Sequence, residues 1–257
     1  MARPQLLDSL PDGFSNSVPI LLLPPSEGKA NDTIDGDFRD DLGDPWAPVS
    51  GAFKVLGDSR QHVVEALAAV DGGDQKLLGV KGDRLDRARR ANSELVGAPT
   101  LPAWKRYTGV VWDHLDPASL AAADRRRIVV VSGLSGLVRG DDPVPDYRLK
   151  MGANLAPLGK LSTWWRTDVT DQLAKLARGR TAKQQRVLVD LLPNEHRAAW
   201  APADDERVVG VDLVDPSGKP GGHFAKAAKG ELARALLTEG WAALDGWEHE
   251  RFEVVVR

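Results

Sequence analysis

Midway along the chain the sequence reads Ile128-Val129-Val130-Val131-Ser132-Gly133-Leu134-Ser135-Gly136. Four consecutive β-branched residues predict a strand covered on both faces, because a half-exposed strand would alternate apolar and polar residues. The small residues that follow predict a tight turn from this strand into a helix. A buried strand that leads into a helix is typical of sheets with helical crossovers.

Similar apolar segments recur along the chain, at residues 20–23, 187–192, 207–214 and 252–256. Helical patterns lie between them, at residues 62–70, 83–96, 117–127, 160–178 and 224–237. We interpret the stretch 104–112 as a short strand or a loop and the stretch 216–222 as a turn. Because strands and helices alternate, the sequence predicts an α/β fold of the mixed α+β type, with a central, mostly buried mixed sheet flanked by helices.

The sequence shows no internal repeat and no linker long enough to separate two domains. We therefore expect residues 18–257 to form a single domain, with a helical hairpin subdomain at about residues 58–97. Residues 1–17 are polar and punctuated by Pro and Gly, which favours a flexible N-terminal extension.

Composition excludes several kinds of chemistry. The 257 residues contain no cysteine, which excludes disulfides, thiolate zinc sites, cysteine-ligated iron–sulfur clusters and thiol-based peroxide scavenging. The net charge of −3 excludes a uniformly basic nucleic-acid coat and allows a local basic patch. No apolar run approaches the roughly 20 residues that span a bilayer, and no signal-peptide pattern occurs. We expect a cytoplasmic protein with no membrane partner.

The histidines show no metal-ligand spacing, neither an i,i+4 pair nor a His-x-His motif. They are His62, His114, His196, His223 and His249. We therefore expect no metal site and no cofactor, and direct iron binding is the least favoured hypothesis.

Charged and small residues gather where the expected strands end, and ligands bind at the carboxyl ends of strands in open α/β sheets. Arg148 can donate two N–H groups to one phosphate or carboxylate. Lys226 lies near the start of an expected helix, where a cation opposes the helix dipole unless an anion lies close by. The candidate ligands for such an anion are Lys29, Ser26, Ser132, Gly133, Arg148 and Lys226. The alternative for each is an ordinary turn or a solvated charge.

A second set of residues suits acid–base chemistry. Glu195 follows the strand at 187–192, and burial there would raise its pKa. A simpler interpretation makes Asn194 the N-cap of a helix with Glu195 in its first turn. The candidate catalytic residues are Glu195, Glu27, Tyr147 and Asn194.

The stretch at 77–85 reads Leu77-Leu78-Gly79-Val80-Lys81-Gly82-Asp83-Arg84-Leu85 and resembles a helix-hairpin-helix. Its glycines permit a sharp turn, and amides at the start of the following helix can donate to a DNA phosphate. The candidate DNA-binding residues are Gly79, Lys81, Gly82 and Arg84. The alternative is an ordinary helical hairpin with a solvated basic face.

Several segments, taken in order, resemble the YaaA family. They are residues 21–29, 107–110, 132–139, 145–152, 191–195 and 224–230. Their order and spacing agree across roughly residues 19–256. The resemblance implies a cytoplasmic mixed α/β protein of the peroxide stress response that limits oxidative damage, with links to lower free iron and to DNA binding. It implies no settled reaction.

Two functional hypotheses follow. The first is a YaaA-like stress protein that binds duplex DNA through the hairpin and limits iron-dependent damage. The second is an enzyme that acts on a nucleotide or a similar phosphorylated small molecule. In that hypothesis Glu195 or Glu27 hydrolyses an N-glycosidic bond while arginine and lysine side chains hold the phosphate.

Overall fold

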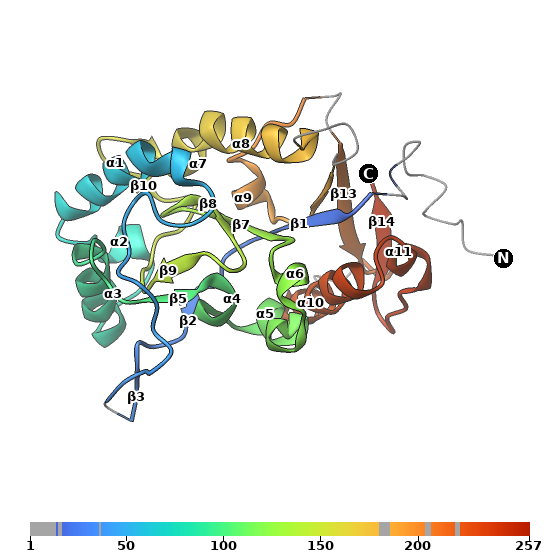
Figure 1. Cartoon of the computed structure of the whole chain (residues 1–257), viewed down its shortest axis with the longest axis horizontal. Coiled ribbons are helices and arrows are strands. Elements are labelled where there is room, and N and C mark those ends of the chain that lie inside the picture. Colours follow the sequence, from blue (N-terminus) through green and yellow to red (C-terminus); the bar gives the residue numbers. More distant parts are fainter. Residues whose placement is uncertain (1–13, 15–16, 36, 180–185, 204–206, 219–221) are drawn as a thin grey trace.

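Six strands form the central sheet, in the order β14-β13-β12-β1-β7-β8. The computed structural model describes residues 14, 17–35, 37–179, 186–203, 207–218 and 222–257. The strands are β1 (Pro19–Leu23), β7 (Ile128–Ser132), β8 (Gly136–Arg139), β12 (Val187–Asp190), β13 (Val208–Val214) and β14 (Glu253–Val256). β13, β12, β1 and β7 run parallel, whereas β14 and β8 are antiparallel edge strands. This mixed sheet between helices confirms the predicted fold class (Figure 1).

β1 lies in the middle of the sheet because both of its faces are apolar. Leu21, Leu22 and Leu23 are fully buried. Leu21 pairs with Val189 on one side and Ile128 on the other. Burying each such side chain contributes roughly 1.5–3 kcal/mol. Continuous apolar runs of this kind therefore specify interior strands.

Helices lie on both sides of this sheet (Figure 1). α8 (Arg166–Arg178) covers one side, and α10 (Gly222–Thr238) covers the other. α10 packs closely along α5 (Val110–Leu115) at Gly230, where a Cβ atom would lie only 2.4 Å from the Val111 carbonyl oxygen. The final helix, α11 (Ala242–Gly246), follows α10.

A helical region lies at the other end of the molecule from β13 and β14, on the left of Figure 1. It contains α1 (Gly57–Ala68), α2 (Gln75–Leu78) and α3 (Asp83–Ser93). Arg60 of α1 is 1% exposed and donates to the carbonyl oxygens of Ser135 and Leu137. These hydrogen bonds tie the helical region to the β7–β8 hairpin and satisfy a buried guanidinium that would otherwise be costly.

Short elements connect these two parts. The paired short strands are β2 (Gly28–Lys29) with β6 (Tyr107–Thr108), β3 (Thr33–Ile34) with β4 (Asp37–Phe38), β5 (Thr100–Pro102) with β9 (Pro143–Pro145), and β10 (Asn154–Leu155) with β11 (Gly159–Lys160). The short helices are α4 (Ala103–Arg106), α6 (Ala122–Arg125), α7 (Leu161–Trp164) and α9 (Asn194–Arg197), and short 3-10 helices occur at Lys54–Leu56 and Pro117–Ser119. The β2–β6 pairing sets Lys29 opposite Tyr107, which positions the site described below.

The turn after β7 differs from the prediction. The chain enters the antiparallel strand β8, with Ser132 paired to Gly136, so the predicted turn into a helix is wrong. Gly136 has a φ of 65°, a conformation that favours glycine. A Cβ atom there would also lie 2.7 Å from the Trp165 ring. The small residues therefore form a buried hairpin turn.

Three further segments differ from the prediction. The strand or loop expected at 104–112 holds most of α4, then β6 and the start of α5, with Gly109 at a φ of 104° between the last two. The helix expected at 117–127 is a 3-10 turn followed by α6. The helix expected at 160–178 is divided into α7 and α8 at Trp165.

Some expectations fall wholly or partly outside the described residues. These are the N-terminal extension at 1–13 and 15–16, and residues 219–221 of the turn expected at 216–222. Phe14 is buried in the core, and the indole N–H of Trp241 donates to the Ser17 carbonyl oxygen at 2.8 Å. These two contacts fix the chain to the core just before β1 begins.

Candidate functional site

A cleft of about 370 Å³ opens between the chain that follows β1, the helix α3 and the chain around Tyr147. Its lining includes Glu27, Lys29, Tyr147 and Arg148 from the predicted ligand site, and Val80 and Arg84 from the predicted hairpin. We call it the Lys29 cleft. Residues that the sequence assigned to two different functions therefore border one cavity.

The amine of Lys29 is held against aromatic rings. Its Nζ atom lies 4.1 Å from the centroid of the Tyr147 ring and 5.7 Å from that of Tyr107. It donates one hydrogen bond, of 3.0 Å, to the Ser26 carbonyl oxygen. Burial lowers the pKa of Lys29 to about 7, although Asp146 acts in the opposite direction. Near neutral pH this amine therefore exists in both its charged and its neutral form.

A chain of hydroxyl groups lies beneath Lys29. The Tyr147 hydroxyl is 2.9 Å from Ser132 Oγ and 3.0 Å from the Tyr107 hydroxyl. Ser132 Oγ also accepts from the backbone N–H groups of Leu134 and Ser135, both at 3.3 Å. Since those amides already donate to it, Ser132 can donate its proton to Tyr147. Burial raises the pKa of Tyr147 and of Tyr107, so both phenols stay protonated.

Glu27 and Arg148 form an ion pair at the mouth of the cleft. Arg148 Nη2 lies 2.8 Å from Glu27 Oε2, and Lys150 Nζ lies 3.4 Å from Glu27 Oε1. Burial acts to raise the pKa of Glu27, but these cations outweigh it and lower the pKa. Glu27 is therefore a carboxylate at neutral pH. Arg148 keeps donor capacity, because its Nε donates to the Leu78 carbonyl and its Nη2 to Glu27.

Asn92 joins the cleft to α3. The Asn92 side chain is 1% exposed. Its Oδ1 accepts from the Arg148 backbone N–H, and its Nδ2 donates to the Arg148 carbonyl, each at 2.9 Å. This two-way contact fixes the helix that follows the hairpin relative to the ligand residues.

Both glycines of the turn between α2 and α3 have a positive φ. Gly79 ends α2 at a φ of 66°, and Gly82 precedes α3 at a φ of 59° and ψ of −148°. No side chain caps α3, so the amides of its first turn have no side-chain acceptor. Lys81 and Arg84 are exposed beside these amides, with Asp83 partly offsetting their charge.

The predicted ligand and catalytic residues that do not line the cleft are Ser26, Ser132, Gly133, Lys226, Glu195 and Asn194. The Ser26 hydroxyl accepts from the Gly28 backbone N–H at 3.2 Å. Ser132 and Gly133 are buried in the hairpin turn, where the Gly133 carbonyl accepts from the Trp165 indole at 2.9 Å. Lys226 is exposed on α10. Glu195 accepts from the Gly152 backbone N–H at 2.7 Å.

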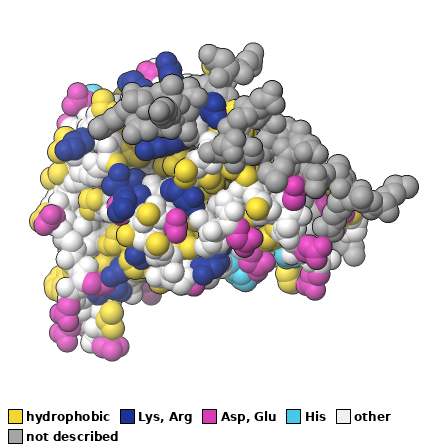
Figure 2. Space-filling view, turned by 45° about the vertical axis from the view of Figure 1, so that its right-hand side comes forward, with side chains coloured by type: hydrophobic (Ala, Val, Ile, Leu, Met, Phe, Trp, Pro, Cys, Tyr) yellow, Lys and Arg dark blue, Asp and Glu magenta, His cyan; other side chains and the backbone are white. Residues whose placement is uncertain are grey.

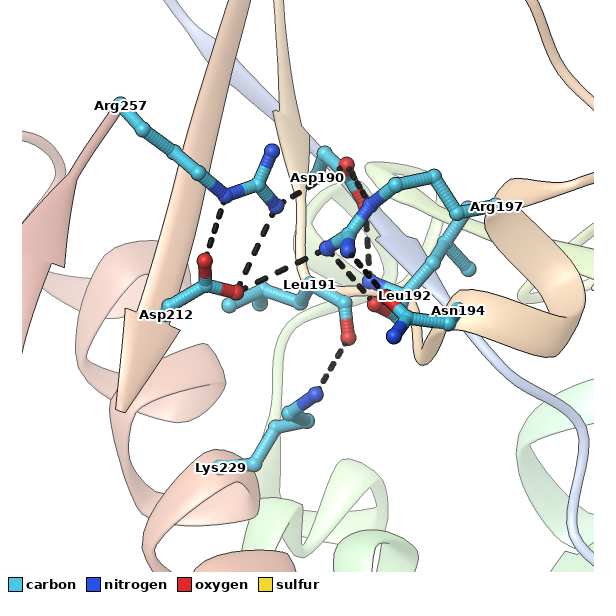
Figure 3. A network of polar contacts seen from close by, with 8 residues as sticks. All are labelled: Asp190, Leu191, Leu192, Asn194, Arg197, Asp212, Lys229 and Arg257. Atoms are coloured by element: carbon cyan, nitrogen blue, oxygen red, sulfur yellow. Dashed lines mark hydrogen bonds and ion pairs between the residues drawn. The ribbon is translucent and has the colours of Figure 1, made fainter. Parts of the chain in front are cut away.

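Asn194 belongs to a network at the carboxyl end of β12, shown in Figure 3. The N-cap of α9 is Pro193, so the interpretation of Asn194 as the cap is wrong. Its Oδ1 instead accepts from Arg197 at 2.9 Å. Arg197 also pairs with the buried Asp190 at 2.6 Å.

The same network contains Arg257 and Lys229 (Figure 3). Arg257 pairs with Asp212 at 2.5 Å and with Asp190 at 3.4 Å. Lys229 donates to the Leu191 carbonyl at 2.7 Å, and burial lowers its pKa. Each charge in this network has an opposite charge or a carbonyl oxygen as its partner. The contacts link β12, β13, α9 and α10 to Arg257, the last residue of the chain.

On the face that Figure 2 shows, Lys and Arg side chains gather mainly around the middle of the view, and most Asp and Glu side chains lie toward its edges. The β3–β4 projection exposes Ile34 and Phe38, at 56% and 70%. Among the described residues, no group of three or more His, Asp or Glu side chains is arranged to hold a metal ion. None of the described helices has the length and apolar character needed to cross a membrane.

Some residues of the site were not selected from the sequence. Tyr107 closes the hydroxyl chain, and Asp146 pairs with Arg87 of α3 at 2.7 Å in the wall of the cleft. Lys150 pairs with Glu27. All three lie in segments that carry the resemblance to the YaaA family, and this resemblance could have identified them from the sequence.

Comparison with known proteins agrees with these segments. Residues 20–254 match the family described as "Peroxide stress protein YaaA". A UPF0246 protein of Streptomyces coelicolor is 36% identical over 235 residues, which cover 87% of this chain and 84% of that protein. A UPF0246 protein of Corynebacterium efficiens is 34% identical over 226 residues, covering 85% of each chain. One from Idiomarina loihiensis is 30% identical and covers 74% of this chain and 76% of its own length. This chain therefore belongs to the YaaA family of peroxide stress proteins.

Proposed function

We propose that this YaaA-family protein acts in the cytoplasm during peroxide stress by binding duplex DNA through the hairpin at residues 79–82 and the start of α3. The observation that supports this most is the hairpin itself. Two glycines with positive φ bring an uncapped helix start to the surface between two exposed cations, Lys81 and Arg84. Amides and cations in this arrangement suit a backbone phosphate.

The surroundings of the hairpin support the same proposal. Arg84 lines the Lys29 cleft, and a second hollow of about 440 Å³ continues along α3 past Arg87 and Arg90. A duplex that lay on α3 would therefore meet cations on successive turns of the helix. Contacts of this kind are independent of base sequence and release counterions, so they weaken with salt. By covering DNA, the protein would limit iron-dependent damage to it.

The test compares two double variants of equal charge change. Lys81→Glu/Arg84→Glu removes the two hairpin cations. Lys175→Glu/Arg126→Glu makes the same change at exposed positions on α8 and beside α6. Fluorescence anisotropy with a short duplex of arbitrary sequence should show at least tenfold weaker binding for the hairpin variant only. Equal loss in both variants, or no binding by the native protein, would overturn the proposal.

A second candidate is an enzyme that acts on a nucleotide or similar phosphorylated small molecule. The observation that favours it is the buried hydroxyl chain under Lys29, which is more acid–base machinery than DNA contact requires. Here Arg148 and Lys29 hold the phosphate, and Glu27 is the carboxylate that borders the cleft. A role for Glu195 in the same step requires movement of its contact with Gly152.

Thermal shift with a panel of nucleotides and sugar phosphates tests this second candidate. A ligand at 100 times its Kd stabilises a protein by about 2.7 kcal/mol, which raises Tm by several degrees. The shift should disappear in Arg148→Met and persist in Arg166→Met, which changes an arginine that donates to Ala198 elsewhere. If no compound in the panel shifts Tm, this candidate fails.

A further inference from the structure

Lys29 differs in its partners from Arg148 and Arg87, which also line the cleft. Arg148 pairs with Glu27, and Arg87 pairs with Asp146. Within the described part of the chain, Lys29 has no carboxylate within ion-pair distance, and it donates a hydrogen bond to the backbone carbonyl of Ser26. The Tyr147 ring faces its amine. A lysine built only to hold an anion has no need of aromatic burial, whereas a nucleophilic amine does, because burial disfavours its charged form.

The protonation state supports a nucleophile. An ordinary lysine, with a pKa near 10.4, is uncharged in only about one molecule in 2,500 at neutral pH. Burial places the pKa of Lys29 at about 7, so roughly half of the molecules carry a free lone pair at that pH. Amine nucleophiles of this kind form imines with carbonyl carbons.

The position of Lys29 indicates which carbonyl carbon it meets. Lys29 shares its cleft with Val80 of the hairpin and Arg84 of α3. The volume of about 370 Å³ is enough for a sugar with its phosphate and is small for a folded macromolecule. A nucleotide extruded from a duplex on the hairpin would thus place its sugar beside Lys29, and extrusion is easiest where the base is damaged or missing.

We propose that Lys29 forms an imine with the C1′ aldehyde of an abasic deoxyribose in DNA held by the hairpin, a proposal that rests on the DNA-binding function above. Abasic sugars equilibrate with an open-chain aldehyde, so no oxidant or cofactor is required. The lone pair on Lys29 Nζ attacks C1′, and the carbonyl electron pair moves to the oxygen, which takes up a proton. The carbinolamine then loses that oxygen as water, and the proton from nitrogen returns to solvent. One amine and one aldehyde yield one imine and one water.

Borohydride reduction tests this directly, because it converts the imine into a stable secondary amine. The native protein and a duplex with one abasic site should yield a covalent adduct on a denaturing gel, and peptide mapping should place it on Lys29. Lys29→Met and Lys29→Arg should each lose at least 95% of the adduct, while Lys175→Met retains it. Circular dichroism and Tm show whether each variant is folded, and the arginine variant keeps the size and charge. The trapping rate of the native protein should rise with a midpoint near pH 7.

Anisotropy with the same duplex separates the two proposals. Binding without an adduct, or an adduct mapped to another lysine, overturns the role of Lys29 and leaves DNA binding intact. An adduct on Lys29 with free 2-deoxyribose 5-phosphate, without duplex binding, supports the amine and overturns the DNA-binding function. If the native protein neither binds the duplex nor forms the adduct, both proposals are contradicted.

Discussion

The Nζ atom of Lys29 lies 4.1 Å from the centroid of the Tyr147 ring, although the two residues are 118 positions apart in the chain. The contact joins the short strand β2, which follows the central strand β1, to the chain that follows β9. Because Tyr147 also carries the hydroxyl that bridges Ser132 and Tyr107, this one ring links a titrating amine to the floor of the cleft.

Tyr147→Phe should lower the free energy of unfolding by about 1–3 kcal/mol. The variant keeps the ring but leaves the buried hydroxyls of Ser132 and Tyr107 without their shared partner. Tyr147→Ala should cost more, about 3–5 kcal/mol, because it also leaves a cavity beneath Lys29. Urea denaturation followed by tryptophan fluorescence measures both changes. Equal stability of Tyr147→Phe and the native protein would show that the hydroxyl chain is not a structural constraint.

The stability of the protein should depend on Lys29 between about pH 7 and pH 10. The pKa of Lys29 is about 7 when folded and near its ordinary value of about 10.4 when unfolded. In this window the unfolded chain binds the extra proton, so the free energy of unfolding rises with pH. Lys29→Met should therefore show a smaller rise than the native protein over this range. If the free energy of unfolding changes equally with pH in the two proteins, the burial of this amine is contradicted.

Asp190→Ala should destabilise the sheet by about 3–5 kcal/mol. Asp190 is 3% exposed and balances Arg197 and Arg257, and its Oδ1 accepts from the Leu192 amide at 2.9 Å. Removing one partner leaves the cations partly uncompensated. Asp212 of the same network has a side chain 44% exposed, so Asp212→Ala should cost at most about 1 kcal/mol. Chemical denaturation of the two variants gives the comparison, and a larger loss from Asp212→Ala would refute this order.

Gly82→Ala should distort the hairpin without a steric clash. Nothing lies within 4 Å of the position of an added Cβ atom, but the φ of 59° and ψ of −148° are strained for alanine, at about 1–3 kcal/mol. Duplex binding should weaken, because the amides at the start of α3 shift. Gly246→Ala is a suitable control, since it also meets open space and its φ is not positive. If Gly82→Ala and Gly246→Ala bind the duplex equally well, DNA binding does not depend on the geometry of the hairpin.

The interior strands of the sheet and its edge strand β14 could be predicted from the sequence, whereas the other edge strand, β8, and the short elements could not. Runs such as Ile128–Val131 have one stable environment, between two layers, so their residues alone specify β1, β7 and β12. β8 begins at Gly136 and ends at Arg139, and neither residue favours a strand. Its pairing depends on the Trp165 ring and on Arg60 of α1, which are distant in the chain. Tertiary contacts of this kind leave no local pattern.

The candidate site was predictable to a similar degree. Glu27, Lys29 and Arg148 were found because they follow apolar segments, and they do border one cleft. Glu195 satisfied the same rule but bonds to the Gly152 amide outside that cleft. Position after a strand therefore selects residues near the carboxyl edge of the sheet without showing which of them share a cavity. The approach of α3, fixed by Asn92, is what joins the hairpin to Lys29.

The salt dependence of duplex binding tests the central claim most directly. For the native protein, the logarithm of the binding constant should fall linearly with the logarithm of salt concentration, by about 0.9 for each phosphate contact. Lys81→Glu/Arg84→Glu should bind more weakly and reduce the slope by about 2, because two such contacts are lost. An unchanged slope in this variant, or a native binding constant that does not depend on salt, would contradict DNA binding through the hairpin.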